Sequence, residues 1–302
     1  MLEHILVPLD GSSLAECVLP HAVALAQAFE ARVTLLRAVD RVGPGDLNRA
    51  VDPLNWHIRK SEAEAYLSEV STRLQEAGLR VEKIVLEGRA AQRIIDFARD
   101  QGVDLMVLSS HGRSGLSGWN ISSVVQKVIL RSYTPTMIVR AYQPVTEELT
   151  GLRYQRLLVP LDGSQRAECI LPLATNLARF HQCRLLLAHV VSRPEVPRRA
   201  PLTQDEAELI DQITERNRQK GERYLEELKS RLSGDVETRL LVSENPALTL
   251  HQLVEKEGAD LVLLAAHGYS GEVQWPYGSV ALNFIAYGTT PLLIIQDVYE
   301  EE

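Results

Sequence analysis

Residues 5–12 read Ile5-Leu6-Val7-Pro8-Leu9-Asp10-Gly11-Ser12, and residues 157–164 repeat them as Leu157-Leu158-Val159-Pro160-Leu161-Asp162-Gly163-Ser164. Extended to residues 5–20 and 157–172, the two runs are identical at 12 of 16 positions. A second block, residues 102–112, returns as residues 258–268. Repetition on this scale indicates a tandem duplication, and 302 residues suit two domains of about 150 each. We therefore predict domains at 1–142 and 156–302, joined by a linker over 143–155.

Each copy alternates short apolar runs with amphipathic segments. In the first copy we expect helices at 13–29, 56–77, 90–101 and near 119–132, and strands at 4–8, 32–39, 81–86, 104–109 and 136–140. Alternation of this kind predicts a parallel sheet with right-handed crossovers. The strand at 105–108 is apolar throughout, as a strand covered on both faces should be. The predicted fold class is α/β, with two Rossmann-like, doubly wound, five-stranded domains in tandem.

Two loops of each copy fall where ligands of such sheets bind, beyond the carboxyl ends of the strands. One is the Asp-Gly-Ser after the first strand, and the other is the His-Gly loop after the fourth. In the second copy, Gly268 is followed by Gly278-Ser279-Val280 at the expected start of the last helix. Glycine permits close backbone approach, and the free N–H groups of a helix start attract phosphate. The pattern predicts a phosphate-binding loop, although it is not a Walker A motif.

The corresponding loops of the two copies have diverged. In the first copy Ser122 replaces the late glycine, and Arg113 follows Gly112. The second copy keeps Gly278 and carries Glu272 within the loop. A serine side chain can fill phosphate space, whereas an arginine attracts an anion. We therefore regard the second copy as the better candidate for nucleotide binding.

The aspartates that end the first strands, Asp10 and Asp162, admit two interpretations. A carboxylate there can accept hydrogen bonds from a ribose hydroxyl or an adenine amine, or contact a phosphate-bound Mg²⁺. It can equally cap the helix that follows. The histidines before the phosphate-loop glycines, His111 and His267, are interpreted as structural or hydrogen-bonding groups, because the sequence identifies no nucleophile with an orienting acid beside them.

The strand-Asp-Gly-Ser opening and the Gly-x-x-Gly-x9-Gly-Ser/Thr pattern resemble those of the universal stress protein family, with one family domain in each half. The resemblance implies an adenine nucleotide α-hydrolase-like fold and binding of ATP, or of AMP or ADP, together with Mg²⁺. By position, the implied ligand-binding residues of the second half are Asp162, Val190, Ala265, Gly268, Gly278, Ser279 and Val280. Those of the first half are Asp10, Ala38, Ser109, Gly112, Arg113, Ser122, Ser123 and Val124. The first signature glycine is replaced by Ser109 and by Ala265.

The implied function is regulation of a stress response through nucleotide binding in one or both halves. Two alternatives stay open: a weak ATPase or nucleotidyl-transfer enzyme, and a ligand-free scaffold for protein interaction. No general base or catalytic lysine is evident, so any hydrolysis should be slow. The family resemblance also implies dimerisation through the last strand, here Thr136–Arg140 with Pro291–Ile295 inside one chain, and leaves a further homodimer open.

Composition narrows the remaining classes. The net charge is −8, which disfavours nucleic-acid binding, because phosphate neutralisation needs a basic face. No apolar stretch approaches the length of a membrane span, and the N-terminus lacks the pattern of a signal peptide. Three cysteines without metal-ligand spacing are typical of a reducing compartment. We therefore expect a cytoplasmic protein with no membrane partner.

Overall fold

The computed structural model describes residues 2–40, 53–113, 115, 121–141, 148–194, 203–269 and 276–297. Residue contacts divide the chain into two compact units, one over Met1–Arg153 and the other over Tyr154–Asp297. Each unit is described by itself. Glu272 and residues 143–147 of the predicted linker lie outside the described residues.

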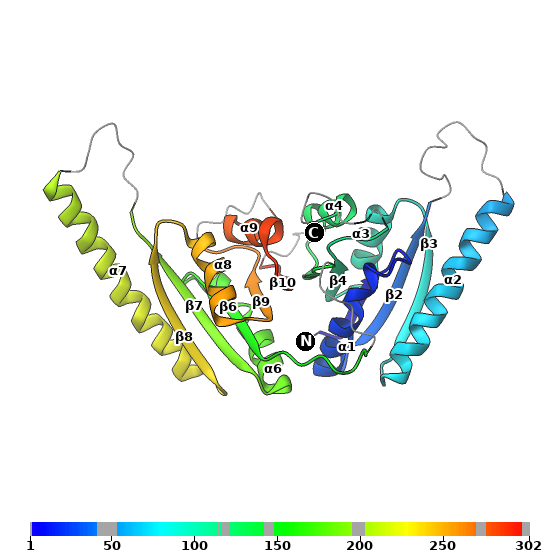
Figure 1. The fold of residues 1–302 in the computed structure, drawn as a ribbon, viewed down its shortest axis with the longest axis horizontal. Helices are drawn as coiled ribbons and strands as arrows, with labels where there is room; N and C mark the ends of the chain where they lie inside the picture. Colours follow the sequence, from blue (N-terminus) through cyan, green and yellow to red (C-terminus); the bar gives the residue numbers. More distant parts are fainter. Residues whose placement is uncertain are drawn as a thin grey trace. The chain divides into compact units, whose positions relative to one another are not determined.

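The first unit is a parallel sheet with helices on it (Figure 1). Its strands run in the order β3-β2-β1-β4-β5, and every neighbouring pair is parallel. The strands are β1 (His4–Pro8), β2 (Arg32–Val39), β3 (Val81–Glu87), β4 (Leu105–Ser109) and β5 (Thr136–Val139). The helices are η1 (Ala15–Val18), α1 (Leu19–Phe29), α2 (Pro53–Glu76), α3 (Ala90–Asp100) and α4 (Ser123–Arg131).

The second unit repeats this arrangement, with the order β10-β9-β6-β7-β8 and parallel pairs throughout. Its strands are β6 (Arg156–Leu161), β7 (Arg184–Ser192), β8 (Val236–Ser243), β9 (Leu261–Ala265) and β10 (Leu292–Ile295). Its helices are α5 (Gln165–Glu168), α6 (Leu171–His181), α7 (Gln204–Arg231), α8 (Pro246–Glu257) and α9 (Ser279–Tyr287). The predicted fold class is confirmed in both halves.

The sequence-based boundaries needed three corrections. The helix expected over 13–29 is broken into η1 and α1, since Pro20 lies in the first turn of α1, where its missing N–H costs nothing. The helix expected from 119 begins at Ser123, with Ser122 as its N-cap. The last strand of the first half ends at Val139, so Arg140 lies just beyond it.

The order of the strands determines where a ligand can enter. In the second unit β6 pairs with β7 on one side and with β9 on the other. After β6 the chain continues to β7, whereas after β9 it continues to β10, which lies on the other side. The loops after β6 and β9 therefore separate at their carboxyl ends and leave a crevice there. Strands β4 and β9 are buried at every position, as predicted. Among the helices of the described residues, none is long and apolar enough to cross a membrane.

Candidate functional site

A cavity of about 650 Å³ opens at the carboxyl ends of β6, β7 and β9 in the second unit. This volume lies within the range of about 300–1,000 Å³ that small-molecule sites occupy. All seven residues that the sequence assigned to the second-half site line this cavity. They are Asp162, Val190, Ala265, Gly268, Gly278, Ser279 and Val280.

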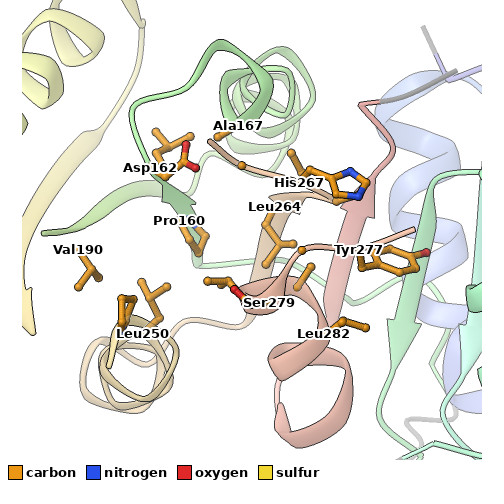
Figure 2. A pocket seen from close by; sticks show the side chains of 18 of the residues that line it. Pro160, Asp162, Ala167, Val190, Leu250, Leu264, His267, Tyr277, Ser279 and Leu282 are labelled. Atoms are coloured by element: carbon orange, nitrogen blue, oxygen red, sulfur yellow. The ribbon is translucent and has the colours of Figure 1, made fainter. Parts of the chain in front are cut away.

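One end of the cavity is apolar. Pro160, Ala188 and Val190 contribute the walls from the sheet, and Pro246 and Leu250 close it from α8. Figure 2 shows Val190 and Leu250 at this end, away from His267 and Tyr277. Flat, uncharged walls of this kind suit a planar ring that gains from leaving water.

The other end of the cavity is formed by the start of α9. Gly278 is the N-cap of this helix, and no side chain of the part of the chain that the structure describes caps it. The amide of Gly278 itself donates to the carbonyl of Ala266 at 2.7 Å, which holds the helix start against the loop after β9. The amides of the first turn have no partner further back in their own helix. Together with the helix dipole, they form a site for an anion beside the hydroxyl of Ser279.

The matching position in the first half is occupied differently. Ser122 is the N-cap of α4, and its hydroxyl accepts from the amide of Val125 at 3.4 Å. One of the amides that would face a phosphate is thus already engaged by the protein. The Gly-to-Ser difference noticed in the sequence therefore has a direct structural consequence, because the first half caps its own helix.

Asp162 connects the loops after β6 and β9. Its Oδ1 accepts from the amide and the hydroxyl of Ser164 at 3.0 and 2.6 Å, and its Oδ2 accepts from the amide of Tyr269 at 2.5 Å. Burial opposes the ionisation of Asp162, but these hydrogen bonds outweigh it and hold its pKa below the usual value. Ser164 in turn caps α5 by accepting from Ala167 at 3.1 Å.

The first half repeats this connection. Asp10 accepts from the amide and hydroxyl of Ser12 at 3.0 and 2.6 Å, and from the amide of Arg113 at 2.5 Å. Neither aspartate accepts from a helix amide of the described residues: each carboxylate holds the serine two residues on, whose hydroxyl accepts from the amide of Ala15 or Ala167, and it also holds the fourth-strand loop. Direct contact of Asp10 or Asp162 with a nucleotide stays a prediction.

A buried group of charges beside the cavity was not predicted. Asp297, just after β10, accepts from His267 Nδ1 at 2.7 Å and from Arg166 Nε at 2.5 Å. The side chains of His267 and Asp297 are each 2% exposed. Burial disfavours the charge of Asp297, but the hydrogen bonds from His267 and Arg166 prevail and lower its pKa. The expected hydrogen-bonding role of His267 is thus confirmed, with an acidic partner that the sequence had not suggested.

The first half holds its histidine by other means. His111 Nδ1 lies 3.1 Å from the hydroxyl of Ser110, and Ser110 accepts from the amide of Ala141 at 3.0 Å. The hydroxyl of Ser109 lies 2.6 Å from the carbonyl oxygen of His111 and 3.0 Å from that of Leu14, so its one proton is directed to groups of the protein.

The remaining residues predicted for the first half lie on the same edge of its sheet. Ala38 is near the end of β2, Gly112 lies against Asp10, and Ser123 and Val124 begin α4. On β2, Leu36 takes the place of the cavity-lining Ala188, because Leu36 pairs with Pro8 as Ala188 pairs with Pro160. A larger side chain therefore stands where the second half has open space.

A five-stranded parallel sheet, present in each half of one chain and accompanied in the second half by an apolar cavity beside a glycine-capped helix start, defines a duplicated, doubly wound α/β domain. The model of the universal stress protein family matches residues 1–140 and 153–296. The chain belongs to the universal stress protein family, and it carries two domains of that family in tandem.

Individual relatives agree with this assignment. A universal stress protein of Methanocaldococcus jannaschii is 28% identical over 155 residues, which are 46% of this chain and 96% of that protein. One from Bacillus subtilis is 31% identical over 149 residues, covering 46% of this chain and all of that protein. The crystal structure of a universal stress protein from Archaeoglobus fulgidus is similar over 99% of this chain and 100% of its own, with a TM-score of 0.70 at 20% identity. This last similarity supports the fold.

Proposed function

We propose that the second half of this chain binds an adenine nucleotide, ATP with Mg²⁺, and that the filled and empty states of the site serve a regulatory role in stress response. The observation that carries the proposal is the cavity of about 650 Å³ that joins an apolar pocket to the uncapped start of α9. The base would lie between Val190 and Leu250, and the phosphates would lie at Gly278 and Ser279.

The charges around the cavity fit a nucleotide bound largely by backbone groups. Among the described residues that line it, Asp162 and His267 are the only titratable side chains apart from Tyr277, and no lysine or arginine is present. The phosphates would therefore rely on main-chain amides and on the Mg²⁺ they bring. Asp162 would act chiefly by holding Gly268 and Tyr269 in place, since its oxygens already accept three hydrogen bonds.

The duplication supplies a matched test. Gly278→Ser gives the second half the N-cap of the first, and Ser122→Gly makes the opposite exchange. Calorimetric titration of the full chain with ATP and Mg²⁺ should give one site in the natural protein. Gly278→Ser should weaken that site by about tenfold or more, because a serine hydroxyl competes for an amide that the phosphate needs.

The reciprocal variant completes the test. Ser122→Gly should leave the second-half site unchanged, and any binding gained in the first half would appear as a second site. Natural protein that shows no heat and no thermal stabilisation at millimolar ATP and Mg²⁺ would contradict the proposal, because a ligand at 100 times its dissociation constant should add about 2.7 kcal/mol. The scaffold alternative would then be favoured. Steady ATP turnover abolished by Gly278→Val would instead favour the enzyme alternative.

A further inference from the structure

The first half contains an arginine that the duplicated fold does not require. Arg37 lies on β2 and is 8% exposed. Its guanidinium lies flat against Gly11, where the three atoms of its tip would each be 3.0 Å from a β-carbon at that glycine. On the other side it lies over the ring of Tyr66, 5.3 Å from the ring centre. Arg37 thus reaches the carboxyl edge of the sheet on the α2 side.

No carboxylate of the described residues forms an ion pair with this guanidinium. Glu16, the nearest acid on η1, is engaged by Tyr66 at 3.1 Å and by Arg73 at 2.8 Å. Asp10 is close enough to influence Arg37, as is Glu62, yet the oxygens of Asp10 accept from Ser12 and Arg113. Burying a guanidinium that has no hydrogen-bonded acid lowers the stability of the fold unless an anion binds to it.

A second arginine borders the same loop. The main chain of Arg113 is fixed to Asp10 through its amide, and its side chain is exposed. Burial and, second, the positive charge of Arg113 lower the pKa of Arg37, while Tyr66, Asp10 and Glu62 act in the opposite direction. The two cations are therefore close enough to repel each other. An anion placed between them would relieve this repulsion.

The second half has neither arginine at the corresponding positions. His189 replaces Arg37, and its Nδ1 lies 2.8 Å from the carbonyl of Leu161, so its ring is bonded within the fold. Tyr269 replaces Arg113. The first half therefore has Arg37 and Arg113 beside Asp10, where the second half has His189 and Tyr269 beside Asp162. The arginines are thus a property of one copy.

We propose that Arg37 and Arg113 form a binding site for a phosphate group in the first half, separate from the nucleotide cavity of the second. Guanidinium groups suit phosphate because their N–H donors match its oxygens in pairs. Successive side chains of a strand point to opposite faces of the sheet. Arg37 faces α2, so its neighbours Leu36 and Ala38 face the other side. In the second half, that other side is where the nucleotide cavity lies. The ligand is either free phosphate or the phosphate of a larger phosphorylated molecule.

The test is titration of the full chain with inorganic phosphate, followed by calorimetry and by phosphorus NMR. The natural protein should bind phosphate in the first half, with an affinity that falls as salt rises. Arg37→His, which installs the residue of the second half, should weaken binding by about tenfold or more. Arg113→Gln should weaken it by a smaller factor, because this side chain is exposed. Arg99→Gln, a change at an exposed arginine of α3, should leave it unchanged.

Two outcomes would contradict the proposed phosphate site. One is the absence of phosphate binding at millimolar concentration, and the other is equal affinity in the natural protein, Arg37→His and Arg113→Gln. Since Arg113→Gln changes only an exposed side chain, the test does not depend on Arg37→His folding well. Gly278→Ser should retain phosphate binding, so this site and the nucleotide site fail independently. In that variant, displacement of phosphate by ATP would show that the site accepts the phosphate of a larger molecule, and its persistence would show that ATP does not enter the site and would favour free phosphate.

Discussion

The carboxylate of Asp162 lies over Gly268 in the space that a β-carbon would need. The same relationship holds between Asp10 and Gly112 in the first half. The glycine of each His-Gly loop is therefore required by an aspartate of the same protein, before any ligand is considered. The aspartate and the glycine, which lie about a hundred residues apart, form one structural unit that sets the distance between the two loops.

Gly268→Ala should consequently displace the loop that carries Tyr269. We expect a loss of about 1–3 kcal/mol in the free energy of unfolding, as for other overpacked sites, and weaker ATP binding. Gly112→Ala is the matched control, since it should cost similar stability without changing the second-half site. Urea denaturation and ATP titration of both variants would check this. Full ATP affinity in Gly268→Ala would show that the loop position does not matter for binding.

Acid should weaken the same connection. The pKa of Asp162 is lowered in the folded protein, so its contribution to stability is complete above the unfolded value of about 4 and is lost as the pH falls through the folded value. Asp162→Asn should therefore be less stable than the natural protein at pH 7, by up to about 1 kcal/mol for this solvent-accessible group. The difference should shrink as the pH falls below about 4 and through the lowered folded value. Urea titrations across this range measure it, and a difference independent of pH would argue against the charge.

The buried acid Asp297 should matter more for stability. Asp297→Ala leaves His267 and Arg166 without their shared acceptor, and we expect a loss of about 2–3 kcal/mol. Arg166→Leu combined with Asp297→Ala installs the residues of the first half, Leu14 and Ala141. The double variant should lose less free energy of unfolding than the two single variants together, because it removes both members of the Arg166–Asp297 ion pair. Strictly additive losses in urea titrations would count against this coupling.

Ala188→Leu should fill the apolar end of the cavity with the side chain that the first half has at Leu36. We expect ATP affinity to fall by about tenfold or more, corresponding to at least 1.4 kcal/mol, with stability changed by less than about 1.5 kcal/mol, because the new side chain enters open space. Calorimetry with ATP measures the effect. Leu36→Ala is the control, and it should not alter the second-half site. Unchanged affinity in Ala188→Leu would place the base elsewhere.

Much of the architecture was accessible from the sequence. The repeat indicated the number of domains, and the apolar runs located the five strands of the first half to within one residue at each end. The seven residues predicted for the second-half site do line one cavity, because β6, β7 and β9 bring their carboxyl ends together. The break between η1 and α1 was missed, since the apolar spacing continues through Pro20 and conceals it.

The Asp297 group was missed for a different reason. Arg166 and Asp297 lie 131 positions apart, and no local pattern links them. The duplication did contain the signal: Leu14 and Ala141 in one copy correspond to Arg166 and Asp297 in the other, so an apolar pair became an oppositely charged pair. Aligning the copies position by position, beyond the shared motifs, would have indicated the contact. Arg37, which corresponds to His189 in the second copy, could have been noticed in the same way.

The self-capped start of α4 has a practical consequence for experiments on this protein. Because Ser122 already caps α4, the first turn of that helix provides an internal standard. It belongs to the same fold and is measured in the same sample at the same temperature. Hydrogen exchange at Ala281 can be divided by exchange at Val125, the amide that Ser122 accepts from, so that changes common to the whole chain cancel. The ratio then isolates the response to nucleotide without a second protein for comparison.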